Sequence, residues 1–148
     1  MGKILSINIS KEKGTIKTPV KEAKVLVDHG IVGDAHAKNW HRQISLLADE
    51  SVEKMRDTLK ENAFKILKPG VFAENILTTG IELKILPIGT QLKIGETIHE
   101  VTQIGKECHH GCEIRKIVGD CVMPREGIFT KVIKSGEIHV DDLIEVIK

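Results

Sequence analysis

Hydrophobic and polar residues alternate in several short segments of the chain, a pattern typical of strands with one buried face. The alternation is clearest in LSINI, residues 5–9, and in AKVLV, residues 23–27. Further strands are predicted at residues 91–94, 97–104, 128–133 and 143–147, with turn signals at Gly89, Gly95-Glu96 and Ser135-Gly136. Many short strands at close spacing predict a β-barrel or a β-sandwich.

A helical pattern interrupts these strands. The apolar residues at helical spacing are Ala48, Val52, Met55 and Leu59. Asp49 is placed to cap the N-terminus, and the stripe continues to residue 67, where Pro69-Gly70 ends it. A second, shorter helix is predicted at residues 112–118. We therefore expect a single, mainly β domain over residues 1–148, compact and barrel-like, with one or two short helices.

Composition limits the classes of partner. The 148 residues include 22 Lys and Arg against 21 Asp and Glu, so no long-range field steers the protein to nucleic acid or to an anionic membrane. The N-terminus lacks the apolar core of a signal peptide and the run of about 20 apolar residues that a membrane span needs. These features predict a cytoplasmic protein. Three cysteines, an odd number, argue against a disulfide framework and leave thiols for catalysis or metal binding.

All three cysteines lie in one segment, KECHHGCEIRKIVGDC, residues 106–121. A zinc site needs four tetrahedral N or S ligands, and the candidates are Cys108, His109, His110, Cys112 and Cys121. The C-x3-C spacing differs from the usual zinc knuckle, and the C-x-x-C geometry of a redox pair is missing.

Two other interpretations of this segment remain open. A reactive thiol needs a positive field, which Lys106, Arg115 and Arg125 are near enough in sequence to supply to Cys121. Pro124 and Gly127 follow in CVMPREGIF, residues 121–129, and a stiff turn holds a preceding cysteine in a fixed position. Cys112, by contrast, is expected to be a small buried hydrophobe on the short helix.

Two polar segments lie outside the cysteine region. In DHGIVGDAHAKNWHRQ, residues 28–43, the side chains of Asp34, His36 and His41 are the ligand types of a non-haem iron triad, although an ordinary surface loop has the same composition. In PGVFAENI, residues 69–76, the Glu74-Asn75 pair is predicted at the head of a strand. Such a turn either lines a pocket or simply connects a helix to a strand.

Taken together and in order, these segments resemble the MOSC family, whose domain is named after the C-terminal part of molybdenum-cofactor sulfurase. The matching pieces are GIVGDAHA, RQISLL, GVFAENI, LPIGTQLKIG, TQIGKECHHGC, CVMPREGIF and GEIHVDDLI. The resemblance implies a compact β-barrel-like domain. It also implies that Cys121 carries a sulfane sulfur or ligates molybdenum through its thiolate, chemistry suited to a soft nucleophile.

The resemblance further implies partners: molybdenum-cofactor assembly proteins, or a pyridoxal-phosphate-dependent cysteine desulfurase that supplies sulfur. The additional Cys108 to Cys112 motif looks like that of small bacterial proteins associated with cofactor assembly. In a sulfur relay, Cys108 would resolve a persulfide on Cys121. In the alternative, a metal site, the ligands would be Cys108, Cys112 and one of the two histidines, His109 or His110. Residue type alone suggests that Arg42, Lys106, Asn75, His36 and Arg125 bind the pterin phosphate.

The sequence thus predicts a molybdenum-cofactor-associated protein that binds the cofactor, carries sulfur on Cys121, or does both. One alternative is a cofactor-dependent reductase component acting on N-hydroxylated compounds. No flavin, haem or iron–sulfur motif is evident in the sequence, and this favours the binding or carrier module. A second alternative, from another class, is an interaction domain stabilised by zinc.

Overall fold

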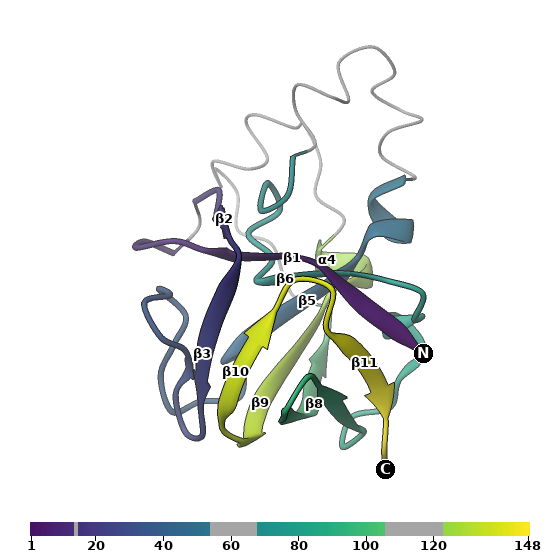
Figure 1. Cartoon of the computed structure of the whole chain (residues 1–148). Coiled ribbons are helices and arrows are strands. Elements are labelled where there is room, and N and C mark those ends of the chain that lie inside the picture. Colours follow the sequence, from purple (N-terminus) through teal and green to yellow (C-terminus); the bar gives the residue numbers. More distant parts are fainter. Residues whose placement is uncertain (14, 54–67, 106–122) are drawn as a thin grey trace.

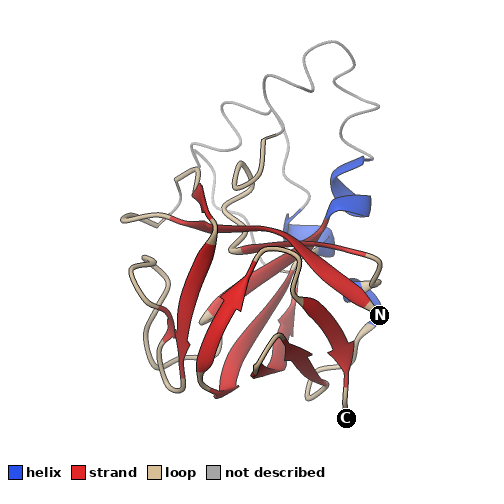
Figure 2. Ribbon diagram, viewed as in Figure 1, coloured by secondary structure: helices blue, strands red, loops and turns tan. Residues whose placement is uncertain are grey.

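A computed structural model describes residues 1–13, 15–53, 68–105 and 123–148 of the chain. Strands dominate these ranges (Figure 2). Their helices are short: the 3-10 helix η2 (Leu83–Ile85), the α-helix α4 (Met123–Glu126) and residues 49–53. None of the helices within the described ranges is long and apolar enough to cross a membrane.

Seven strands form a closed barrel (Figure 1). In spatial order they are β1 (Gly2–Ile9), β11 (Leu143–Val146), β7 (Gln91–Ile94), β8 (Thr97–Ile104), β9 (Ile128–Lys134), β5 (Ile44–Ala48) and β6 (Ile76–Thr79), which pairs again with β1. All these pairings are antiparallel except that of β5 with β6. A parallel pair needs a long crossover, and the chain between β5 and β6 supplies it.

A smaller sheet packs against the barrel. Its strands are β10 (Gly136–His139), β3 (Glu22–Leu26) and β4 (Gly30–Ile31), while β2 (Thr18–Val20) pairs with β1. Figure 1 shows β3 and β10 in front of β9, and β3 contacts β9. Val25 and Ile138 from this sheet join the apolar core that fills the barrel. The loops that leave β3 and β4 are thereby held close to the barrel end.

The prediction of a mainly β, barrel-like fold is confirmed. The six predicted strands correspond to β1, β3, β7, β8, β9 and β11. The sequence did not reveal β5 because all five of its residues are buried, which leaves no alternation to read. Ala48 was therefore wrongly assigned to the helix: it ends β5, and the helix begins at Asp49. Most of that helix, and the one predicted at residues 112–118, lie outside the described residues.

Strand β1 departs from simple alternation. Its register against β6 shifts between Ile4 and Ser6, as at a β-bulge. As a result Ser6 and Asn8 are buried, 7% and 0% exposed, although the pattern predicts them on the polar face. The Nδ2 group of Asn8 donates hydrogen bonds to Ser6 Oγ and to the Glu74 carbonyl oxygen, both at 3.2 Å. The bulge thus connects β1 to the polar turn before β6.

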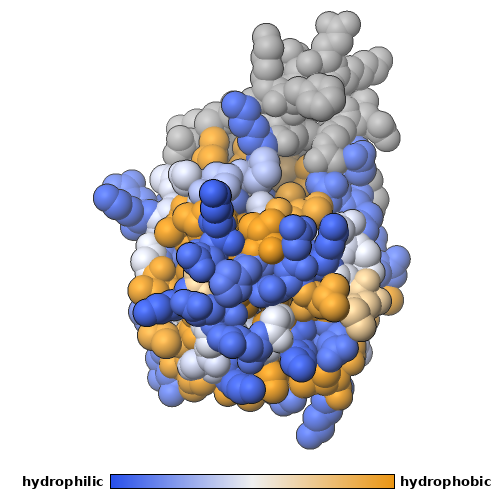
Figure 3. Space-filling view, in the orientation of Figure 1, coloured by the Kyte–Doolittle hydropathy of each residue, from blue (hydrophilic) through white to orange (hydrophobic). Residues whose placement is uncertain are grey.

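The protein surface carries both polar and apolar side chains. The face in Figure 3 mixes hydrophilic and hydrophobic residues without separating them into two regions. Exposed apolar residues include Ile85 and Ile88 near η2 and Leu143 and Val146 in β11. Scattered exposed apolar residues are normal in folded proteins. Charge and geometry, rather than hydropathy, therefore identify the candidate sites.

Candidate functional site

A buried ion pair organises the loop of residues 28–43. Lys17 Nζ lies 2.7 Å from Asp34 Oδ1, and neither side chain is exposed to solvent. The Asp34 carboxylate also accepts hydrogen bonds from the backbone N–H groups of Ser10 and His36, both at 3.1 Å. Burial would raise the pKa of Asp34, but the hydrogen bonds from His36 and Lys17 and the Lys17 charge outweigh it and hold the pKa well below its ordinary value.

The same lysine orients His36. Lys17 Nζ lies 3.2 Å from His36 Nδ1. The same ring nitrogen lies 3.8 Å from Asp34 Oδ2, so the histidine contacts both members of the buried pair. The His36 ring is parallel to that of Trp40, with centroids 6.5 Å apart, and Trp40 Nε1 donates a 2.8 Å hydrogen bond to the His36 carbonyl oxygen. The buried pair thereby fixes both the histidine and the indole beside it.

Three cations gather around the Trp40 ring. Lys38 Nζ, Arg42 Cζ and Lys13 Nζ lie 4.2, 4.8 and 5.0 Å from its centroid. Within the described residues, none of the three forms an ion pair with a carboxylate. The charge of Lys38, followed by partial desolvation and the charge of Arg42, lowers the pKa of Lys13. We call Lys13, Lys38, Trp40 and Arg42 the Trp40 cluster.

Arg42 connects this cluster to the barrel. Its guanidinium carbon lies 5.5 Å from the centroid of Phe129 in β9. Arg42 Nε is buried and has no hydrogen-bond partner in the described part of the chain. A buried donor without an acceptor costs free energy of about 1–3 kcal/mol, which an oxygen of a bound anion would recover. The cluster thus has the chemistry of an anion-binding site.

The turn of residues 69–76 is joined to the same lysine. The Lys17 backbone N–H donates to the Gly70 carbonyl oxygen at 2.9 Å. Gly70 has φ of +88°, and a Cβ there would lie 2.1 Å from the Lys17 carbonyl oxygen, so the close approach requires glycine. Within the turn, buried Glu74 accepts hydrogen bonds from the backbone N–H groups of Gly70, at 2.9 Å, and Phe72, at 3.1 Å. Burial raises the pKa of Glu74 to about 7, against these hydrogen bonds.

Asn75 is fully buried between β1 and β5. Its Nδ2 group donates to the Asn8 carbonyl oxygen at 3.1 Å, and its Oδ1 accepts from Ser45 N at 3.0 Å. Both ends of the amide are therefore hydrogen-bonded within the protein. The structure places Asn75 where it holds the turn against the barrel.

The segment with the cysteines lies outside the described residues, but both of its attachment points are described. The Gly105 N–H donates to the Gly127 carbonyl oxygen at 2.7 Å, so the chain leaves and re-enters the barrel at one place. Gln103 Nε2 donates to the Gly105 carbonyl oxygen at 2.7 Å, and Gln103 Oε1 lies 3.0 Å from His41 Nε2. His41 is next to Arg42, and its ring meets that of Trp40 edge to face at 5.7 Å. Hydrogen bonds thus link His41, which lies between Trp40 and Arg42 in the sequence, to Gly105 and through it to Gly127.

The predicted site residues fare differently. His36 and Arg42 lie together in the loop that carries Trp40, whereas Arg125 is exposed on α4. The remaining candidates are outside the described residues: Lys106, Cys108, His109, His110, Cys112 and Cys121. Asp34, His36 and His41 do not gather as an iron triad, because Asp34 is paired with Lys17 and His41 with Gln103. The one metal-type grouping found among described residues is Glu22, Glu137 and His139, all exposed.

Sequence reasoning missed Lys17, Lys38 and Trp40. For Lys17 the sequence carries no signal, because only the fold brings it to Asp34. For the other two a signal exists in the composition of KNWHR, where an indole stands among cationic residues close in the sequence; a bend at residues 38–41 brings Lys38 and Arg42 to the Trp40 ring.

Comparisons with known proteins agree with this architecture. The family model of the MOSC domain matches residues 33–145.

The YuaD protein from Bacillus subtilis is similar in structure, with a TM-score of 0.74 and 18% identity, covering 99% of this chain and 96% of that one. YiiM from Geobacillus stearothermophilus has a TM-score of 0.76 at 19% identity, covering 100% and 76%. YiiM from Escherichia coli has a TM-score of 0.73 at 20% identity, covering 100% and 70%. At these identities the likeness shows the fold alone. No curated protein matches the sequence.

Proposed function

Because the chain belongs to the MOSC family, a family linked to molybdenum-cofactor-binding proteins, we propose that it binds this cofactor or carries sulfur for its assembly in the cytoplasm. Cys121 is the proposed sulfur-bearing residue. One observation carries the proposal: three cations that have no carboxylate partner in the described part of the chain surround Trp40, next to the place where the cysteine segment joins the barrel.

The Trp40 cluster fits the anionic end of the cofactor. Arg42 offers a planar fork of donors, including the buried Nε that has no acceptor among the described residues, and this geometry suits a phosphate. Lys13 and Lys38 add point charges, and the lowered pKa of Lys13 reflects positive charge that an anion would relieve. The imidazole of His36, parallel to the Trp40 ring, supplies a further polar group.

The other predicted residues take roles around this cluster. Asn75 acts as a positioning residue, because its amide is already used to hold the turn. Lys106 and Arg125 flank the cysteine segment and are proposed to extend the positive field towards the phosphate. Partners would be molybdenum-cofactor assembly proteins or a cysteine desulfurase.

Cys121 is proposed to act as a thiolate. When bound, the cofactor supplies a thiophilic metal that such a thiolate can ligate. As a carrier, the Cys121 thiolate attacks the outer sulfur of a persulfide on the donor protein; a sulfur–sulfur bond forms on Cys121, the donor's bond breaks, and the donor leaves as a thiolate. Cys108 is proposed to resolve that persulfide, or Cys108, His109 and Cys112 to hold a metal.

Native mass spectrometry with elemental analysis tests the proposal. The protein is purified anaerobically from cells that make the cofactor, as wild type and as Cys121→Ser. We expect a mass for pterin plus molybdenum, or an added sulfur atom, in the wild type and neither in the variant. The first adduct identifies a cofactor binder and the second a sulfur carrier.

Two results would contradict the proposal or redirect it. One zinc per chain in both proteins, with neither adduct, would indicate the zinc-stabilised interaction domain instead. In that case chelation would unfold the protein, and Cys108→Ser or Cys112→Ser would be as damaging as Cys121→Ser. Turnover of an N-hydroxylated compound by cofactor-loaded protein with an electron donor would identify the reductase component.

A further inference from the structure

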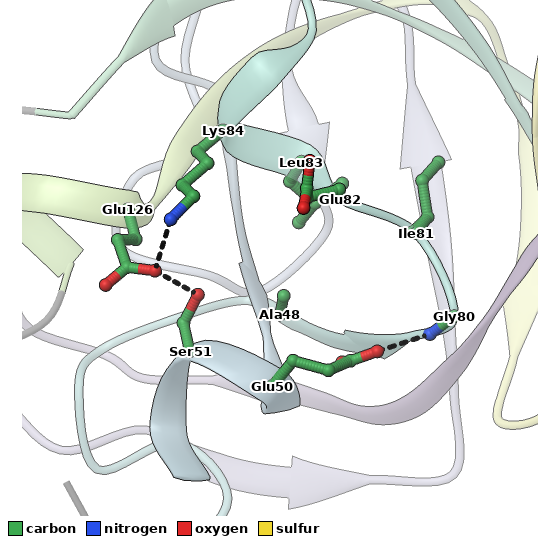
Figure 4. A pocket seen from close by; sticks show the side chains of 9 residues that line it. All are labelled: Ala48, Glu50, Ser51, Gly80, Ile81, Glu82, Leu83, Lys84 and Glu126. Carbon is green, nitrogen blue, oxygen red and sulfur yellow. Dashed lines mark hydrogen bonds and ion pairs between the residues drawn. The ribbon is translucent and has the colours of Figure 1, made fainter. Parts of the chain in front are cut away.

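A cavity of about 370 Å³ is lined by residues outside the Trp40 cluster (Figure 4). Its walls come from the start of the helix after β5, from the turn between β6 and η2, and from α4. This volume falls in the range of roughly 300–1,000 Å³ that is typical of small-molecule sites. None of the residues that line it belongs to the Trp40 cluster, so the two sites are built from separate parts of the chain.

The charge of the cavity is negative. Among the described residues, its lining contributes three carboxylates, Glu50, Glu82 and Glu126, against one ammonium, Lys84, a net formal charge of −2 for this part of the lining. Lys84 Nζ is 3.3 Å from Glu126 Oε1 and neutralises that carboxylate in part. Glu50 and Glu82 form no ion pair with the described residues. The cavity therefore repels an anion and attracts a cation.

Hydrogen bonds hold the polar wall in place. Glu126 Oε1 accepts from Ser51 Oγ at 2.8 Å, which joins α4 to the helix after β5. On the other side Glu50 Oε2 accepts from the Gly80 N–H at 2.8 Å. Figure 4 shows these two interactions on opposite sides of Ala48. A preformed wall of this kind reduces the cost of ordering side chains around a ligand.

Apolar side chains form the rest of the lining. Ala48 and Leu83 are 6% and 1% exposed, and Ile81 is partly buried beside them. A ligand must therefore present an apolar body to these residues and a positive charge to the carboxylates. A metal ion fits neither requirement: within the described residues Glu50, Glu82 and Glu126 do not come close enough together to ligate one ion.

We propose that this cavity binds a small organic cation, a protonated amine with a short apolar body. The ammonium group interacts with Glu50 and Glu82, and the alkyl group packs against Ile81, beside the buried side chains of Ala48 and Leu83. The site is independent of the proposed cofactor chemistry, since it uses neither the Trp40 cluster nor Cys121.

Titration with three ligands of equal chain length tests this assignment: pentylamine, 1-pentanol and pentanoate. Binding is followed by calorimetry and by the amide NMR signals of Gly80 and Glu82. We expect pentylamine to shift these signals and to bind at least about tenfold more tightly than 1-pentanol, with no binding of pentanoate, because only the amine complements the negative charge.

Variants locate the interaction. Glu50→Gln keeps an acceptor for the Gly80 N–H, and Glu82→Gln changes an exposed side chain, so both should fold, which circular dichroism checks. Each should weaken pentylamine binding by about twofold to fivefold, the effect of one exposed charge pair, and the double variant should weaken it further. Glu145→Gln in β11, outside the cavity, is the matched control and should leave binding unchanged. Equal binding of pentylamine and 1-pentanol, an unaffected double variant, or an equal effect of the control would overturn the proposal.

Discussion

Asp34 and Glu74 are two buried carboxylates that both feel the charge of Lys17, and their pKa values shift in opposite directions. Asp34 contacts the Lys17 ammonium directly at 2.7 Å, and its pKa is held well below the ordinary value. Glu74 accepts only backbone N–H groups among the described residues, and its pKa is raised to about 7 by burial. Burial acts on both groups, so the difference comes from the hydrogen bonds of His36 and Lys17 to Asp34 and from the direct contact with the Lys17 charge.

This contrast assigns different roles to the two segments. The loop with Asp34 is fixed by a full charge pair, which in turn orients His36 and leads to the Trp40 cluster. The turn with Glu74 is fixed without an ion pair, by two hydrogen bonds from backbone N–H groups to the Glu74 carboxylate and by the close contact of Gly70 with the Lys17 backbone. The stability of the loop should therefore depend on the ammonium group of Lys17. The stability of the turn should depend on the backbone of Lys17, which contacts Gly70.

Removing the charge should have the largest effect. Lys17→Met leaves Asp34 buried without its cation, so we expect the free energy of unfolding at pH 7 to fall by about 3–5 kcal/mol. Urea denaturation measures this loss. Lys93→Met, at an exposed lysine in β7, is the control and should change stability by less than about 0.5 kcal/mol.

The double variant Lys17→Met/Asp34→Asn sharpens this test. It removes the unpaired charge, so it should be more stable than Lys17→Met alone. A single variant that loses less than about 1 kcal/mol, or a double variant whose loss is the sum of the two single losses, would contradict the charge-pair account.

The pH dependence of Glu74 gives the next largest effect. The pKa of Glu74 is about 7 in the folded protein and about 4.5 when unfolded. The folded state therefore binds this proton more tightly, and the stability that Glu74 contributes is fully present below pH 4.5 and lost as pH rises to 7. The expected loss is about 2–3 kcal/mol. Asp34 contributes no slope in this window, because its lowered pKa makes stability fall only in stronger acid.

Glu74→Gln isolates that slope. Glutamine resembles the protonated acid, so the variant should gain stability relative to the wild type between pH 5 and 7. Buried His99 adds a slope of opposite sign: burial lowers its pKa to about 3, so its contribution is lost as pH falls below 6.5. The comparison must therefore use the difference between variant and wild type at each pH. A difference that does not vary with pH would show that Glu74 is ionised throughout.

A glycine pair gives the smallest effect. Gly70→Ala should cost about 1–3 kcal/mol, because it combines a positive φ of +88° with a Cβ that would lie 2.1 Å from the Lys17 carbonyl oxygen. Gly89 has φ of +97° but open space around its Cβ position, so Gly89→Ala measures the backbone strain alone. Thermal denaturation of both compares them, and equal losses would rule out the contact with Lys17 as a determinant of the turn.

The sequence predicted the parts of this molecule that follow local rules. Strands such as β7 and β8 alternate in hydropathy because one face is buried, and six strands were found in this way. Strand β5 was not predicted, because both of its faces are buried and its residues do not alternate in hydropathy. Ser6 and Asn8 were misplaced because a bulge in β1 changes which residues face the core, and no pattern of residue types encodes that shift.

The candidate site was predictable only in part. His36 and Arg42 stood out by residue type and lie together at Trp40. Lys17, which organises both segments, is brought to Asp34 and Gly70 by tertiary structure, and a single lysine between Ile16 and Thr18 gives no sign of burial. The amide of Asn75 seemed available for a ligand, yet the fold uses both its ends. The positions of His36 and Arg42, of Lys17 and of Asn75 all depend on distances in space, which the sequence does not give.

If the Trp40 cluster and Cys121 bind one anionic ligand, loss of the Arg42 charge should release it. The measurement is the molybdenum and pterin content per chain of Arg42→Gln, purified anaerobically beside the wild type and the control Lys93→Gln. We expect Arg42→Gln to lose most of the bound cofactor while the control retains the wild-type content. A cofactor-loaded wild type whose content is unchanged in Arg42→Gln would contradict it.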